Sequence, residues 1–83
     1  MDEKLIGELK EDFKREWPVT IAREEVEKYT GGLVAAKSMA MYDSLGTGVK
    51  NPITFGRKIV YRKKDLIDWI INNINKKNIK KGE

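Results

Sequence analysis

The sequence predicts one small, mainly α-helical domain that carries a β-hairpin. Two runs of alternating apolar and polar residues flank a Gly-Arg-Lys tip between residues 53 and 62. Apolar residues with a helical period occur toward both ends of the chain, and a glycine pair separates two short helical segments between them. With 83 residues, the chain has room for one modest hydrophobic core.

The composition narrows the classes of function. The chain has no cysteine, which argues against a disulfide framework or a thiolate metal site. It also has no histidine, which removes the commonest general base and the commonest transition-metal ligand. We therefore expect neither catalysis nor a metal or other cofactor. No apolar stretch approaches the roughly 20 residues that span a bilayer, and the charged start does not resemble a signal peptide, so we expect a cytoplasmic protein.

Charge is distributed unevenly along the chain. Residues 1–30 carry six basic and nine acidic side chains, a balance of −3. Residues 31–83 carry eleven basic and four acidic side chains, a balance of +7. A polyanionic partner would therefore meet the later part of the chain. Lysines that only keep a small domain soluble would give the same composition, so charge alone leaves both explanations open.

Residues 2–16 are expected to form an amphipathic helix. Apolar side chains recur every four residues along one face, and one more widens this stripe: Leu5, Leu9, Phe13 and Trp17, with Ile6. Pro18 ends the helix because proline disfavours the α conformation in the residue before it. We expect residues 1–17 to be an accessory element that packs on the core of the main domain, residues 18–75.

Residues 21–29 and 35–45 are expected to form two short helices joined by a glycine turn. Thr20 can cap the first, and Gly31 and Gly32 end it. This pair matches a helix-turn-helix, whose second helix enters the DNA major groove, although an ordinary helical hairpin has the same pattern. The expected inward stripe of the second helix is Met39, Tyr42 and Leu45. The candidates for base contacts on its other faces are Lys37, Ser38, Ala40 and Met41.

Residues 53–62 are expected to form the hairpin, with Gly56 and Arg57 at the bend. Its apolar residues alternate with the others: Ile53, Phe55, Ile59 and Tyr61 against Thr54, Lys58, Val60 and Arg62. Glycine permits the positive φ that a tight bend requires. Arg57 and Lys58 would then project from the tip, where they could bind phosphate or enter a minor groove, or simply keep the turn soluble.

Residues 64–75 are expected to form the last helix. Its stripe follows the helical period: Leu66, Trp69, Ile70, Asn73 and Ile74. Asp65 in the first turn suits the helix dipole. Trp69 is expected to anchor the core because it lies on this stripe. Residues 76–83 are basic without an apolar repeat, which indicates either a solvated end or an arm that seeks phosphate.

Between residues 20 and 72 the order of motifs resembles the excisionase-type, MerR-like winged helix-turn-helix family. Family members often read Thr-Gly-Gly-Leu before the second helix, as residues 30–33 do here. They often continue with Gly-x-Gly and a proline, then Gly-Arg-Lys-Val-x-Tyr and Asp-Leu-x-x-Trp. The corresponding segments are residues 46–48, Pro52, residues 56–61 and residues 65–69, with isoleucine in place of the valine.

The resemblance implies a double-stranded DNA-binding protein of bacterial, archaeal or phage origin that is associated with the nucleoid. Such proteins act as excisionases, which direct recombination, or as small transcriptional regulators of phages and mobile elements; related packaging proteins use the same domain. The helix with Lys37, Ser38, Ala40 and Met41 would read the major groove. The hairpin would be the wing, contacting DNA through Arg57, Lys58 and Arg62. Possible partners are an integrase and further copies of the chain, which the acidic face of the first helix could meet.

Three departures from the family pattern affect this expectation. Ala35 stands where the family commonly has a serine or threonine N-cap, at a cost of about 1 kcal/mol. The segment between Gly48 and Pro52 is one residue longer than usual. The predicted reading helix has one lysine, no arginine, and the acidic Asp43, so arginine-to-guanine contacts are not available from it. We therefore expect modest, salt-dependent affinity with a contribution from DNA shape. The alternative function is a winged-helix module that binds a protein and no DNA.

Overall fold

The computed structural model describes the backbone of residues 3–76 and the side chains of residues 3–74. This part of the chain contains four α-helices, one short 3-10 helix and a three-stranded antiparallel sheet. In chain order the elements are α1 (Glu3–Glu16), β1 (Thr20–Ala22), η1 (Arg23–Glu25), α2 (Val26–Tyr29), α3 (Ala36–Leu45), β2 (Ile53–Phe55), β3 (Lys58–Arg62) and α4 (Lys63–Lys76). None of the helices in residues 3–76 combines the length and the apolar character needed to cross a membrane.

Helix α1 forms as the sequence predicts and ends one residue before Trp17. Its buried face is centred on Ile6 and Phe13, whereas Leu5, expected in the stripe, is half exposed. Phe13 stacks on Trp17 with ring centroids 4.1 Å apart, and both side chains belong to the main core. The Lys63 ammonium donates to the carbonyls of Lys14 and Trp17, which satisfies acceptors left free at the end of α1. The helix is therefore fixed to the rest of the domain by packing and by its C-terminus.

The predicted helix over residues 21–29 is wrong in its first part. Thr20–Ala22 form strand β1, which pairs antiparallel with β3 so that Ile21 lies opposite Tyr61. Thr20 is therefore not a helix cap; Ala22 precedes η1 and makes no side-chain cap bond. The backbone of this segment is extended because β3 supplies its hydrogen-bonding partners, and a local helical pattern carries no information about a partner so distant along the chain.

The turn after α2 forms as predicted. Gly31 and Gly32 have positive φ angles of 66° and 90°. The Gly32 amide donates to the carbonyl of Glu27 at 2.8 Å, which is the hydrogen bonding expected where a glycine ends a helix. Thr30 is buried, and its hydroxyl donates to the carbonyl of Val26 at 2.8 Å. The turn thus directs the chain from α2 into α3 with its polar groups satisfied.

Helix α3 begins after Ala35, which makes no side-chain cap bond, in agreement with the missing N-cap. It ends at Gly46, whose φ of 78° is left-handed. Met39 is fully buried and Tyr42 packs edge-on against Trp69, with ring centroids 5.2 Å apart. The expectation that Leu45 completes the inward stripe is wrong, because this side chain is 67% exposed. Leu45 lies on a side of the last turn of α3 that faces away from the core, whereas Tyr42 of the same turn packs on Trp69.

The hairpin of β2 and β3 turns at Gly56 and Arg57 as predicted, and Gly56 has a φ of 63°. Phe55 pairs with Lys58 and Ile53 pairs with Val60. Cross-strand partners lie on the same face of a sheet, so the apolar residues of β2 do not share the face of Tyr61. Tyr61 points into the core, whereas Ile53 and Phe55 are exposed on the opposite face. In the sheet, β3 lies between β1 and β2.

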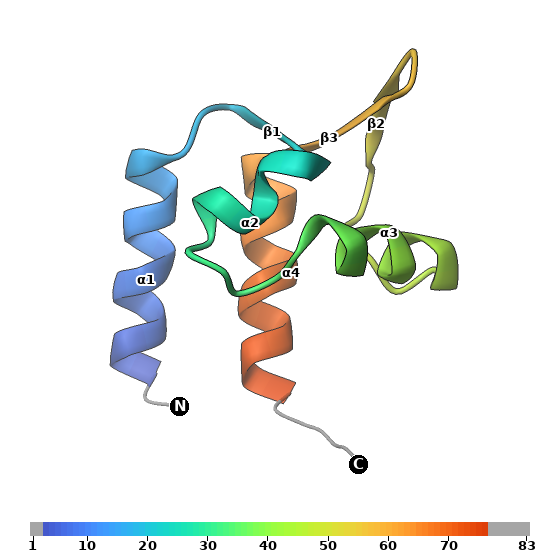
Figure 1. The fold of residues 1–83 in the computed structure, drawn as a ribbon. Helices are drawn as coiled ribbons and strands as arrows, with labels where there is room; N and C mark the ends of the chain where they lie inside the picture. Colours follow the sequence, from blue (N-terminus) through green and yellow to red (C-terminus); the bar gives the residue numbers. More distant parts are fainter. Residues whose placement is uncertain (1–2, 77–83) are drawn as a thin grey trace.

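Helix α4 is buried on more than one side. Leu66 and Ile70 are buried as predicted, but Ile67, outside the predicted stripe, is buried too, and Asn73, inside it, is exposed. Figure 1 shows the reason: α4 stands in the middle of the domain, antiparallel to α1 on one side and with α3 on the other, where Tyr42 contacts Trp69. Of the predicted basic tail, residues 77–83 lie outside the described residues.

Candidate nucleic-acid interface

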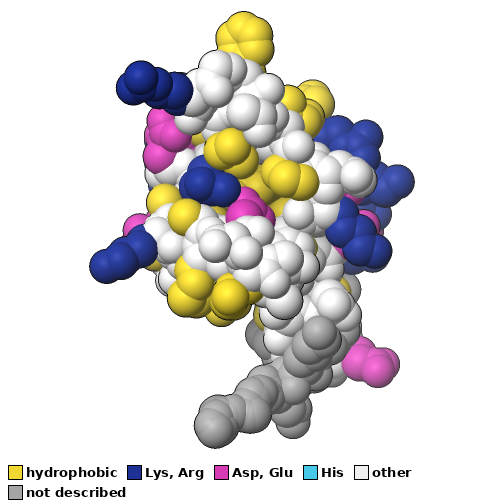
Figure 2. All heavy atoms as spheres, turned by 90° about the vertical axis from the view of Figure 1, so that its right-hand side faces the viewer, with side chains coloured by type: hydrophobic (Ala, Val, Ile, Leu, Met, Phe, Trp, Pro, Cys, Tyr) yellow, Lys and Arg dark blue, Asp and Glu magenta, His cyan; other side chains and the backbone are white. Residues whose placement is uncertain are grey.

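Helix α3 and the hairpin project from the same side of the molecule, away from α1 (Figure 1). Figure 2 shows that side of the surface. Hydrophobic side chains occupy much of its centre next to one basic and one acidic side chain, further basic side chains stand on both flanks, and acidic side chains cover little of the surface. The two features that the sequence suggested for DNA contact are therefore presented together.

The four predicted contact residues of α3 divide into two pairs. Lys37 and Met41 are exposed and, four residues apart, lie on one stripe of the helix, opposite the buried Met39. Ser38 and Ala40 are half-buried and flank this stripe. The exposed stripe offers one cation and one flexible apolar side chain, which suits backbone and methyl contacts better than hydrogen-bonded base recognition.

The hairpin carries the other three predicted contact residues, Arg57, Lys58 and Arg62, which differ in their positions and partners. Arg57 is exposed at the tip. The Lys58 ammonium pairs with the Glu24 carboxylate of η1; this bond raises the pKa of Lys58 and lowers that of Glu24. Arg62 lies at the other end of β3 and donates to Asp65 of α4 at 2.9 Å. Arg57 and Lys58 thus belong to one basic tip, and Arg62 does not.

Three side chains from η1, α3 and β3 meet below the hairpin in a group that we call the Asp43 network: Arg23, Asp43 and Tyr61. The Arg23 guanidinium and the Tyr61 hydroxyl each donate to Oδ2 of Asp43 at 2.6 Å. The Nε of Arg23 also donates to the Tyr61 hydroxyl at 3.0 Å. The Asp43 side chain is only 14% exposed. Its negative charge, expected to weaken DNA binding by α3, is therefore turned inward and paired.

Sequence reasoning missed this network because its members are separated by 20 and 18 residues along the chain. Arg23 lies in a segment that reads as a solvated helix face, and Asp43 reads as an exposed acid near the end of α3. The sequence offers one sign that the chain passes close to Asp43: the two glycines of the following loop, Gly46 and Gly48. A Cβ placed on Gly48 would lie 2.0 Å from Oδ1 of Asp43, so the chain can approach this carboxylate only through a glycine.

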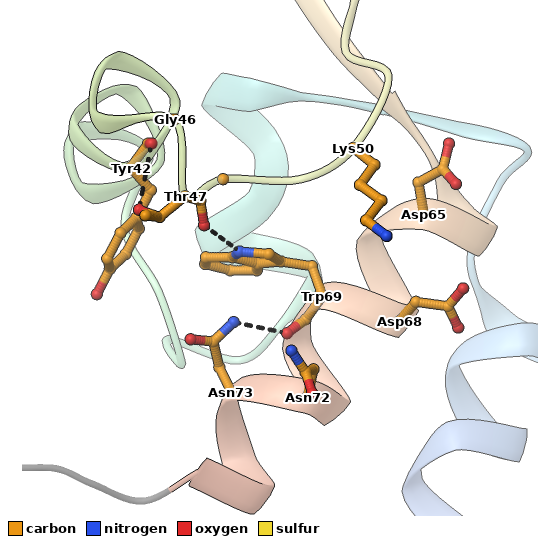
Figure 3. A pocket seen from close by; sticks show the side chains of 10 residues that line it. Tyr42, Gly46, Thr47, Lys50, Asp65, Asp68, Trp69, Asn72 and Asn73 are labelled. Atoms are coloured by element: carbon orange, nitrogen blue, oxygen red, sulfur yellow. Dashed lines mark hydrogen bonds between the residues drawn. The ribbon is translucent and has the colours of Figure 1, made fainter.

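The loop after α3 is fixed to α4. The indole of Trp69 donates to the carbonyl of Thr47 at 2.9 Å, and the Thr47 amide donates to the carbonyl of Tyr42 at 3.0 Å (Figure 3). These bonds border an open pocket of about 660 Å³ whose α4 side carries Asp65 and Asp68. Trp69 is half-buried here: its ring packs on Tyr42, and its indole N–H holds the loop after α3 to α4. Lys50 also lines the pocket, so its charged lining is two carboxylates and one ammonium, a balance that does not favour phosphate.

Within residues 3–76 there is no group of three acidic side chains arranged to hold a metal ion. Comparisons of this chain with protein-family models, with curated protein sequences and with solved structures found no match.

Tyr61 should make the stability of the domain sensitive to alkaline pH. Burial, together with the hydrogen bond to Asp43, raises the pKa of Tyr61 from 10.0 to about 12. As the pH rises through this interval, the unfolded chain loses the Tyr61 proton while the folded chain keeps it. The stabilisation is thus complete below pH 10 and is lost as the pH approaches 12.

The measurement is the free energy of unfolding in urea at a series of alkaline pH values, for the wild type and for Tyr61→Phe. The other ionisable groups are common to both chains, so their effects cancel in the difference. We expect the wild-type value to fall more steeply than that of Tyr61→Phe between pH 10 and 12. Parallel curves would mean that the hydroxyl is not held in its protonated form.

Proposed function

We propose that this chain is a double-stranded DNA-binding protein with a winged helix-turn-helix fold. In this proposal α2 and α3 form the helix-turn-helix, and the β2–β3 hairpin is the wing. The observation that carries it is the joint placement of α3 and the wing on one side of the molecule, held together by the Asp43 network (Figures 1 and 2). A helix in the major groove and a basic loop on the flanking backbone are the two contacts that such domains make.

The charges on this side support the proposal. Lys37 and Arg57 are exposed cations on α3 and on the wing. Two acids of the neighbouring elements are paired within the domain, Asp43 of α3 with Arg23 and Glu24 of η1 with Lys58. Because Glu24 and Lys58 are both more than half exposed, a phosphate can replace this carboxylate at little cost. The surface offered to a duplex therefore carries little uncompensated negative charge.

Within this class, the motif resemblance favours an excisionase or a small transcriptional regulator of a phage or mobile element. The single lysine and the exposed Met41 on α3 predict low intrinsic sequence selectivity. Adjacent copies on DNA, or an integrase bound beside the chain, would raise the effective affinity without further base contacts. Such a protein would work in the cytoplasm at the nucleoid.

The test compares two double variants that each remove one arginine and one lysine. Arg57→Ala/Lys58→Ala changes the wing tip, and Lys14→Ala/Arg15→Ala changes exposed residues of α1, far from the wing. Affinity for a fluorescent random-sequence duplex is measured by anisotropy over a range of salt concentrations. We expect the wing variant to lose about tenfold in affinity at low salt. The slope of log affinity against log salt should fall by about 0.9 for each phosphate contact removed.

The control variant has the same net charge as the wing variant and should keep the wild-type slope. Equal slopes of log affinity against log salt for the two variants would show that the wing does not contact DNA. If the wild type itself shows no salt-dependent affinity for duplex DNA, the DNA-binding proposal fails as a whole.

The alternative is a winged-helix module that binds a protein. The exposed Met41 and Leu45 on α3 favour it, because a helix that presents apolar side chains suits a protein groove. The same salt titration separates the two functions, since a protein-binding module would show almost no affinity for the duplex at any salt concentration.

A further inference from the structure

The most exposed large hydrophobic side chain in the described part of the chain is at the tip of the wing. Phe55 is 82% exposed and immediately precedes the Gly56–Arg57 turn. It is the last residue of β2, and Figure 1 shows this tip standing free of the helices. The register places Phe55 on the face opposite Tyr61, so the side chain has no access to the core. An aromatic ring in this position exposes apolar area without any gain to folding.

The neighbours of Phe55 indicate what kind of partner it suits. Lys58 is its direct cross-strand partner, and Arg57 follows one residue after Gly56. The centre of a protein–protein interface is depleted in charged residues, whereas surfaces for nucleic acids combine cations with aromatic rings that stack on bases. Ile53 is also exposed on this face, but Phe55 stands at the tip next to two basic residues, of which Lys58 is paired with the exposed Glu24. An aromatic ring beside basic residues at a projecting tip fits a polyanion with stackable faces better than it fits a protein groove.

We propose that Phe55 is a wedge that enters a base step from the wing, in the minor groove, and opens the stack there. This inference rests on the proposed function and specifies how the wing would act. Arg57 would lie beside the step, where its guanidinium could bind a phosphate of the backbone. Apolar wedges of this kind partially unstack a step and kink the duplex, and phenylalanine is among the residues that serve.

A wedge of this kind has a consequence for DNA preference. Unstacking a paired step costs free energy, and that cost is smaller where the duplex is already interrupted. The chain should therefore bind a duplex with a two-nucleotide bulge more tightly than the same duplex without it. Phosphate contacts alone would bind the two duplexes about equally. Flexible pyrimidine–purine steps should be favoured over stiff A-tracts for the same reason.

The experiment uses the full chain with a fluorescent duplex of about 25 base pairs, with and without a central bulge, and with dyes at both ends for energy transfer. The variants are Phe55→Ala, Phe55→Trp and, as a control, Val19→Ala. Val19 is 75% exposed in the loop between α1 and β1, so the control also removes an exposed hydrophobic side chain. Circular dichroism confirms that each variant is folded.

We expect wild type and Val19→Ala to prefer the bulged duplex about tenfold and to shorten the dye-to-dye distance on binding. Phe55→Ala should lose both effects and keep the salt slope, because its phosphate contacts are intact. Phe55→Trp should keep both the bulge preference and the shortened dye-to-dye distance. The wedge proposal fails if Phe55→Ala keeps the bulge preference and the bend. The DNA-binding proposal still stands in that case, provided that Arg57→Ala/Lys58→Ala lowers the slope of log affinity against log salt. If Phe55→Ala instead weakens self-association in sedimentation without changing DNA binding, the ring serves a second copy and the wedge is likewise overturned.

Discussion

Asp43→Ala is expected to lower the free energy of unfolding by about 3 kcal/mol. The substitution removes the acceptor shared by the Arg23 guanidinium and the Tyr61 hydroxyl. The Tyr61 side chain is fully buried, so its hydroxyl cannot exchange the lost bond for one to bulk water. Arg23 is 27% exposed and can recover part of its hydration, which keeps the loss below that of a fully buried pair.

The matched control is Asp68→Ala, which removes an exposed carboxylate from α4 and should change stability by no more than about 0.5 kcal/mol. Asp43→Asn should lie between the two, because an amide oxygen still accepts from Tyr61 but carries no charge for Arg23. Urea unfolding followed by circular dichroism measures all three. If Asp43→Ala is as stable as Asp68→Ala, the network does not hold α3 to the hairpin.

Gly48→Ala is expected to destabilise the domain by about 2 kcal/mol, since the added methyl group would overlap the Asp43 side chain. Its Cβ would lie 2.0 Å from Oδ1 and 3.0 Å from the backbone nitrogen of Asp43, so the carboxylate must leave its position. Gly7→Ala provides a control with the opposite sign. Gly7 lies in α1, and a Cβ added there would meet no atom within 4 Å, so alanine should stabilise the helix by up to about 1 kcal/mol.

A double-mutant cycle tests whether Gly48 acts through Asp43. In the Asp43→Ala background the carboxylate is absent, so Gly48→Ala should cost clearly less than in the wild type, and only the backbone contact remains. Additive losses would show that Gly48 is required for the path of the loop itself and not for the approach to Asp43. Both outcomes are read from the same urea unfolding curves.

Local patterns in the sequence predicted most elements of the fold. Two helix ends are set by short-range features: Pro18 follows the end of α1, and the left-handed Gly46 ends α3. The hairpin follows from alternation on both sides of a glycine that takes a positive φ. In each case the physical cause, a steric restriction or a local hydrogen bond, operates within a few residues and is therefore visible in a short window of sequence.

The tertiary structure decided what depends on contacts between distant segments. Thr20–Ala22 became a strand because β3 was available to pair with it, and Ile67 is buried because α4 is covered on two sides. The same is true of the candidate interface. Lys37 and Arg57 could be selected from the sequence by their charge and position, whereas the pairing of Lys58 with Glu24 and of Arg62 with Asp65 could not.

Taken alone, the sequence determined the kind and order of most elements, strand β1 excepted, and the basic residues that could meet a polyanion, because these depend on local conformation and composition. Only the tertiary structure decided that Asp43 faces inward and that Phe55 faces outward. Both outcomes follow from strand register and helix packing, which bring together residues that are far apart along the chain. The charge that α3 presents and the shape of the hairpin tip were therefore set by packing and not by the sequence pattern of either element.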